Sequence, residues 1–173
     1  MSEIDPLILN DFVKESKGLI GPMLELLEGL EGDFSQVQKL ADYGNRVDRI
    51  MGGAQILAMM VGPGHALHII SDYAAICKAV GYKASQITDN AEFYNICVAL
   101  LIDATETLER LMDHLNDTTG QLKKEFSSPF LDRLNWVSEK FSADFRSSVG
   151  SNSEIEQIGI EGLMKKLGLN KTT

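Results

Sequence analysis

The sequence predicts an all-α protein: an antiparallel bundle of about five helices with a flexible linker and a short C-terminal helix. Apolar residues recur at three- and four-residue steps through most of the chain, and no alternating strand pattern competes with them. Glycine, proline and capping residues interrupt the pattern at intervals that suit helices joined by short connections. We therefore expect a helical bundle over residues 1–146, a linker over residues 147–158 and a recognition helix over residues 159–173.

The first two helices follow from this periodicity. A helix over residues 6–30 carries apolar side chains at helical spacing, beginning with Ile8. A second helix is predicted over residues 35–61, with Met60 among its core positions. It must end before Gly62-Pro63-Gly64, because proline and glycine disfavour the helix interior.

The remaining helices are marked by similar boundaries. A third helix is predicted over residues 65–80 and should stop near Gly81. A fourth begins after Asn90, and its apolar stripe continues without a break as far as Phe126. Ser127-Ser128-Pro129 ends that helix and opens a fifth, with proline in its first turn.

Composition excludes several classes of partner and site. The formal net charge of −9 disfavours nucleic acid and anionic membranes, which attract basic proteins. The N-terminus has no basic region followed by an apolar run, so no signal peptide is predicted, and no apolar run spans a bilayer. Cys77 and Cys97 lie in apolar-periodic segments, which favours buried thiols in a cytoplasmic protein.

The third helix carries three residues that could form a metal site. His65, His68 and Asp72 have the spacing of three ligands on one helical face. No fourth ligand is evident and the chain lacks a C-x-x-C motif, so we expect partly exposed histidines and no metal bound by this chain.

One stretch of the fourth helix, D-T-T-G-Q, contains residues that weaken a helix. Glycine costs about 1 kcal/mol relative to alanine in a helix interior, and threonine costs up to about 0.7 kcal/mol. Because the apolar stripe continues on both sides, we expect the stretch to be helical all the same. Asp117 and Gln121 would then lie one turn apart on the outer face of the helix. Residues that weaken a helix without a local benefit point to a functional site at that position.

This stretch resembles the active segment of the CheZ family of chemotaxis phosphatases, which has Asp-x-x-Gly-Gln followed by basic residues. The resemblance implies that Gln121 orients a water for attack on the aspartyl phosphate of a CheY-like receiver. It also implies that Asp117 engages the receiver's lysine. The Mg²⁺ belongs to the receiver, so this chain needs no cofactor of its own. CheZ proteins are dimers, but no feature of this sequence decides whether the chain forms a homodimer.

The C-terminal residues are similar to the peptide with which the same family grips its receiver. Four apolar residues, Ile160, Leu163, Met164 and Leu167, have the spacing of an amphipathic helix that docks in a groove. A second contact tethered by a linker would raise the local concentration of the receiver at the active face.

The first half resembles a histidine phosphotransfer (Hpt) domain over residues 25–57. Such domains carry a phospho-accepting histidine in the pattern R-x-x-H-T-L-K-G-S. Here Arg49 stands in place of the histidine and Gly52 in place of the lysine, and a shifted register would put Asp48 there instead. The resemblance therefore implies an Hpt-like bundle without phosphorelay chemistry.

Together these features predict a protein that binds a phosphorylated CheY-like response regulator and accelerates its dephosphorylation. The alternative is a non-catalytic adaptor, built on the Hpt-like bundle, that holds a receiver or a histidine kinase. The third possible function is that of a helical protein with no role in phosphosignalling.

Overall fold

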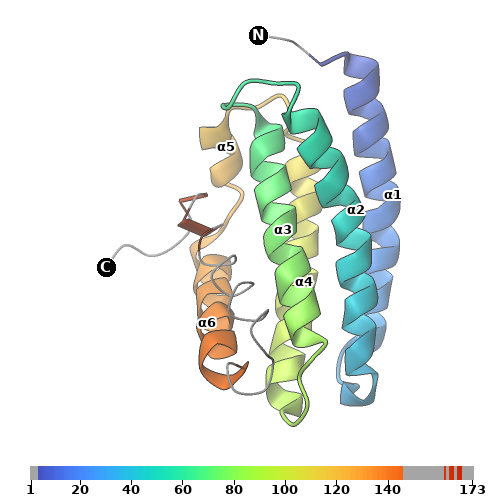
Figure 1. Cartoon of the computed structure of the whole chain (residues 1–173), viewed down its shortest axis with the longest axis vertical. Coiled ribbons are helices and arrows are strands. Elements are labelled where there is room, and N and C mark those ends of the chain that lie inside the picture. Colours follow the sequence, from blue (N-terminus) through green and yellow to red (C-terminus); the bar gives the residue numbers. More distant parts are fainter. Residues whose placement is uncertain (1–3, 146–161, 163, 166, 169–173) are drawn as a thin grey trace.

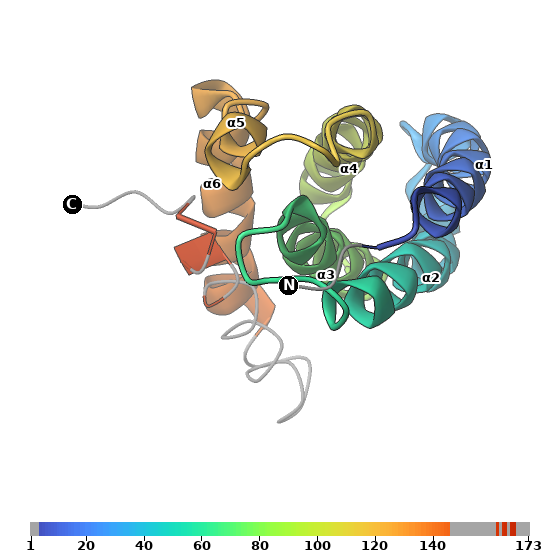
Figure 2. The same ribbon diagram turned by 90° about the horizontal axis from the view of Figure 1, so that it is seen from above.

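The computed structural model describes residues 4–145, 162, 164–165 and 167–168. Four long helices run alternately up and down, side by side, and two further helices pack along one flank of this bundle (Figures 1 and 2). No strand occurs within the described part of the chain, which confirms the predicted all-α class. In chain order the α-helices are α1 Pro6–Leu30, α2 Leu40–Ala58, α3 Ala66–Ala84, α4 Ala91–Met112, α5 Thr119–Lys123 and α6 Ser128–Phe145. The predicted linker lies outside the described residues.

Helix α1 has the predicted bounds, but the second helix begins later than expected. A 3₁₀ helix, η1 Phe34–Lys39, precedes α2, and the side chain of Asp33 caps it by accepting a hydrogen bond from the Ser35 amide at 3.2 Å. Gln36 has non-helical dihedral angles, with φ −102° and ψ 16°. The prediction of one helix over residues 35–61 is therefore wrong at its start, because tighter 3₁₀ turns reverse the chain between α1 and α2.

Helices α2 and α3 make the closest contact in the bundle. A Cβ atom added to Gly81 would lie 2.8 Å from the ring of Tyr43, and one added to Gly44 would lie 2.7 Å from the ring of Tyr82. The absence of side chains at these two positions lets the backbones approach. Gly81 was expected to end the third helix, but α3 continues through it to Ala84 because this glycine is packed against α2.

Three buried tyrosines connect the helices with hydrogen bonds. The hydroxyl of Tyr43 pairs with the Thr105 hydroxyl at 2.9 Å, and the hydroxyl of Tyr73 donates to the Ala104 carbonyl at 2.7 Å. Tyr94 donates to the carbonyl of Leu30 at 2.5 Å. Each bond satisfies a polar atom that burial would otherwise leave unpaired, so the core is specified by polar contacts as well as by packing.

The fourth helix ends at Met112 rather than continuing to Phe126. The chain turns over residues 113–118 and enters the five-residue helix α5, which packs against α3. Leu115, Leu122 and Phe126 are all buried, so the apolar stripe is real although the helix is not continuous. Helix α6 then packs against α4, where Phe93 contacts both Trp136 and Phe141. None of the described helices is long and apolar enough to cross a bilayer.

Candidate functional site

The D-T-T-G-Q stretch is the start of a helix. Thr118 is the N-cap of α5, and its hydroxyl accepts a hydrogen bond from the Gln121 amide at 3.3 Å. The Gln121 carboxamide oxygen accepts in return from the Thr118 amide at 3.0 Å. This reciprocal pair is a capping box, which threonine and glutamine form when they stand three positions apart, with two residues between them. Thr118 and Gln121 therefore have a local structural role that the helix-propensity argument missed.

The expected geometry of Asp117 and Gln121 is wrong. Asp117 lies before the N-cap, in a turn where its amide donates to the His114 carbonyl at 3.0 Å, and Gln121 lies inside α5. The two side chains are therefore not successive residues on one face of a continuous helix. The Gln121 side chain remains exposed, and the Asp117 side chain is 40% exposed.

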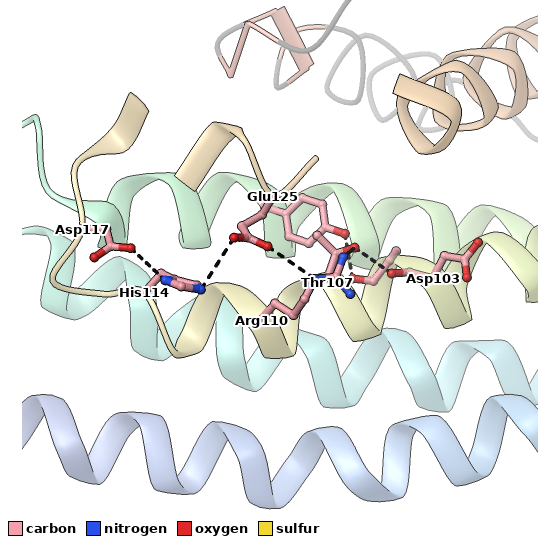
Figure 3. A network of polar contacts seen from close by, with 8 residues as sticks. Asp103, Thr107, Arg110, His114, Asp117 and Glu125 are labelled. Atoms are coloured by element: carbon pink, nitrogen blue, oxygen red, sulfur yellow. Dashed lines mark hydrogen bonds and ion pairs between the residues drawn. The ribbon is translucent and has the colours of Figure 1, made fainter. Parts of the chain in front are cut away.

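Asp117 belongs to a chain of polar contacts that runs from the end of α4 through the α4–α5 connection to Glu125, just after α5 (Figure 3). His114 Nδ1 lies 2.8 Å from Asp117 Oδ2, and its Nε2 lies 3.6 Å from Glu125 Oε1. Glu125 Oε2 in turn lies 3.5 Å from Arg110 Nε, and an Arg110 amino group donates to the Thr107 hydroxyl at 2.9 Å. These groups are partly solvated, so each pair is weak. Together they link the end of α4 and the α4–α5 connection to the residue Glu125 that follows α5.

The degenerate phosphotransfer position is on the surface of α2. The Arg49 guanidinium pairs with Glu15 of α1 at 3.2 Å, and both side chains are about two-thirds exposed, at 64% and 66%. Asp48 pairs instead with Lys78 of α3 at 2.7 Å. A Cβ atom added to Gly52 would meet no heavy atom within 4 Å, so the surface beside Arg49 is open.

Most of the large exposed apolar side chains gather at one end of this surface. They come from the first turn of α1, the last turn of α2 and the two residues that follow α2, and include Leu7 at 71%, Ile56 at 65% and Met59 at 86% exposure. The two turns are neighbours, because Arg49 meets Glu15 and Gly53 lies against Phe12 in the antiparallel pair. We call this set the apolar end face; its members are Leu7, Ile8, Ile56, Met59 and Met60.

Sequence reasoning missed most of the apolar end face. Ile8 and Met60 were expected in the core, yet they are 44% and 45% exposed. Both follow the apolar periodicity of their helices, and periodicity alone does not say whether the last turn of a helix has a neighbour to cover it. Large exposed apolar side chains that gather at one end of a surface mark an interaction site more often than scattered apolar residues do.

The histidines of the third helix have no ligand geometry. His65 is the N-cap of α3, and its Nδ1 accepts a hydrogen bond from the Leu67 amide at 3.1 Å. Partial burial lowers the pKa of His65, and the neighbouring His68 adds to that shift. No group of three or more His, Cys, Asp or Glu side chains within the described residues is arranged to hold a metal ion.

Two of the four predicted partner contacts in the tail are buried on the protein itself. Met164 is 1% exposed and Leu167 is 2% exposed, and both join the hydrophobic core of the bundle. Gly168 lies close to Lys123 of α5. Ile160 and Leu163 lie outside the described residues.

Comparison of the chain with protein-family models, curated proteins and solved structures gives no match.

Proposed function

We propose that the protein binds a CheY-like receiver domain through the apolar end face and Arg49, and holds the receiver without accepting its phosphoryl group. The observation that carries this proposal is the position of Arg49, exposed on α2 with open space at Gly52 and with exposed apolar side chains about two to three helical turns away. An apolar patch beside a charged anchor is a common composition for a protein interface.

Arginine at this position supports binding and excludes phosphorelay through it. A guanidinium is a fixed cation with planar donors that match a carboxylate or a phosphoryl group. It is not the imidazole nucleophile that a relay requires, and none of the three histidines of the chain lies on α2. Arg49 can therefore pair with an anionic receiver site but cannot carry the phosphoryl group onward.

The Glu15 partner does not block this role. Ion pairs between exposed side chains contribute about 0–1 kcal/mol, so the guanidinium can exchange Glu15 for a better acceptor at little cost. The exposed methionine Met59 suits the same purpose, because its flexible side chain adapts to a partner surface.

A direct binding experiment tests the proposal. Receivers encoded near the gene would be titrated against the full chain, with and without phosphorylation by acetyl phosphate. We expect Met59→Lys to reduce affinity at least tenfold and Arg49→Ala to reduce it several-fold, while Arg133→Ala leaves it unchanged. Arg133 is the matched control because it is a half-exposed arginine on α6, paired with Asp103. Failure of every receiver to bind would reject the proposal in favour of a role outside phosphosignalling.

Acceleration of receiver dephosphorylation is the second candidate, and the exposure of Gln121 is the observation that favours it. Orienting a water for in-line attack is much of what phosphoryl transfer requires. The carboxamide oxygen of Gln121 is occupied in the capping box, which leaves its amide group to interact with a partner.

A substitution at Gln121 separates chemistry from capping. Gln121→Glu preserves an acceptor for the Thr118 amide, because glutamate also completes a capping box, but it removes the carboxamide. If the protein is a phosphatase, Gln121→Glu abolishes the faster decay of the phosphorylated receiver while α5 stays folded. If wild type and Gln121→Glu give the same decay as receiver alone, the phosphatase reading is rejected and binding is tested separately.

A further inference from the structure

A cavity of about 850 Å³ lies at the end of the bundle. Its walls come from three segments that are far apart in sequence: the start of α1, the α2–α3 connection and the α4–α5 connection. All three meet at the same end in Figure 1. The volume lies within the range of small-molecule sites, which is about 300–1,000 Å³. The cavity does not depend on the Arg49 surface, so a ligand bound there would have a role separate from receiver binding.

The walls are mainly apolar, and each of the three segments also contributes at least one polar side chain. Leu9, Val61 and Leu115 each come from a different segment and supply apolar surface. Among the described residues that line the cavity there is no lysine or arginine, and the two titratable side chains are His65 and Asp117. His65 uses Nδ1 to cap α3, and its burial favours the neutral form. Within the described part of the wall, the carboxylate of Asp117 is therefore the one formal charge at neutral pH.

Asp117 is oriented and still has acceptor capacity. Its Oδ2 is held by His114 Nδ1 at 2.8 Å, which fixes the carboxylate (Figure 3). No described residue donates a hydrogen bond to its Oδ1. An apolar cavity with one anchored carboxylate and no cation complements a molecule that has an apolar body and a positively charged head.

We propose that this cavity binds a small organic cation, an alkyl- or arylalkylammonium whose ammonium group pairs with Asp117 and whose apolar body fills the space between Leu9, Val61 and Leu115. An anionic ligand is disfavoured by the same carboxylate and by the net charge of −9. Such a ligand would join the three segments that form the cavity, and so would stabilise that end of the bundle by linkage.

Nuclear magnetic resonance titration of the full ¹⁵N-labelled chain tests the proposal. The probes are 2-phenylethylammonium, the neutral 2-phenylethanol and the anionic 3-phenylpropanoate, which share a phenyl ring on a short alkyl chain. We expect the cation to shift the amides of Gly62, Gly64 and Thr118, with an affinity about two- to fivefold above that of the alcohol at low salt, as suits an exposed ion pair. The anion should bind more weakly than either.

Three variants make the result specific. Asp117→Asn should reduce the affinity of the cation to that of the alcohol, whereas Asp113→Asn should not, because Asp113 pairs with Lys17 and does not line the cavity. A Cβ atom at Gly64 meets no heavy atom within 4 Å, so Gly64→Trp should fold and obstruct the cavity, abolishing the shifts from both ligands. Equal affinities for cation and alcohol, shifts that map elsewhere, or equal losses in the two aspartate variants would each overturn the proposal.

Discussion

Replacing Gly81 with alanine tests how closely α2 and α3 pack. The added Cβ atom would lie 2.8 Å from Cδ1 of Tyr43, closer than such contacts occur in proteins. Tyr43 cannot easily move away, because its side chain is fully buried and its hydroxyl pairs with Thr105 at 2.9 Å. Either the Tyr43 ring or the α2–α3 spacing must change, and both are held by surrounding core atoms.

Two opposing effects set the magnitude for Gly81→Ala. Alanine in a helix interior is favoured over glycine by about 1 kcal/mol. Overpacking a rigid core site costs about 1–3 kcal/mol, and the fixed ring of Tyr43 places this site in the upper half of that range. The net effect is a destabilisation of about 1–2 kcal/mol, which corresponds to a melting temperature lower by about 2–8 °C for a chain of this size.

Thermal unfolding followed by circular dichroism measures this shift, with two other glycines as controls. Gly18 is an exposed α1 residue with no heavy atom within 4 Å of an added Cβ, so Gly18→Ala should raise stability by about 0.4–1 kcal/mol. Gly44→Ala should lie between the two, because the ring it meets belongs to Tyr82, which is partly exposed and so less confined than the fully buried Tyr43. If Gly81→Ala stabilises the protein as much as Gly18→Ala does, the close contact is not rigid and the reasoning is refuted.

Three other predictions follow from local contacts. Thr118→Ala removes the N-cap of α5 and should lower stability by about 1 kcal/mol in urea denaturation; an unchanged midpoint would mean that the cap contributes nothing. Burial raises the pKa of Cys77 to about 12 and also raises the pKa of Cys97. A thiol reagent at pH 8 should therefore label both cysteines only in denaturant, and rapid labelling of the folded chain would contradict this. The pKa of His65 is lower in the folded protein than in the unfolded chain, so the unfolded chain takes up the proton first as the pH falls below 6.5. The contribution of His65 to the free energy of unfolding is therefore full above pH 6.5 and declines below that value. His65→Asn keeps a capping side chain that does not titrate. The free energy of unfolding, measured from pH 7 to pH 5, should therefore fall less in this variant than in the wild type.

Much of the bundle is predictable from local sequence because its signals are local. Pro6 at the start of α1, Asn90 before α4 and Pro129 in α6 all mark helix starts that the structure contains. The errors arise where a signal has two meanings. Gly81 reads as a helix stop, but a tertiary contact with Tyr43 keeps it inside α3.

The error at Met112 has a different cause. Apolar residues continue at helical spacing beyond it, and Leu115, Leu122 and Phe126 are buried as that spacing predicts. The same spacing is satisfied by a turn followed by a short helix packed against α3, so burial does not establish continuity. The T-x-x-Q signature of a capping box lay within the stretch and identifies Thr118 as a helix start.

The tail illustrates why partner contacts are harder to predict than helices. An amphipathic segment gains free energy by burying its apolar face on any complementary surface, whether that surface is a partner or the chain's own bundle. Met164 and Leu167 have the spacing expected for a docking helix, and they are buried in the core of the bundle. A receiver that used these two side chains would have to replace contacts they already make. The exposed apolar end face needs no such exchange, and for this reason the proposed interface is assigned to α1 and α2 rather than to the tail.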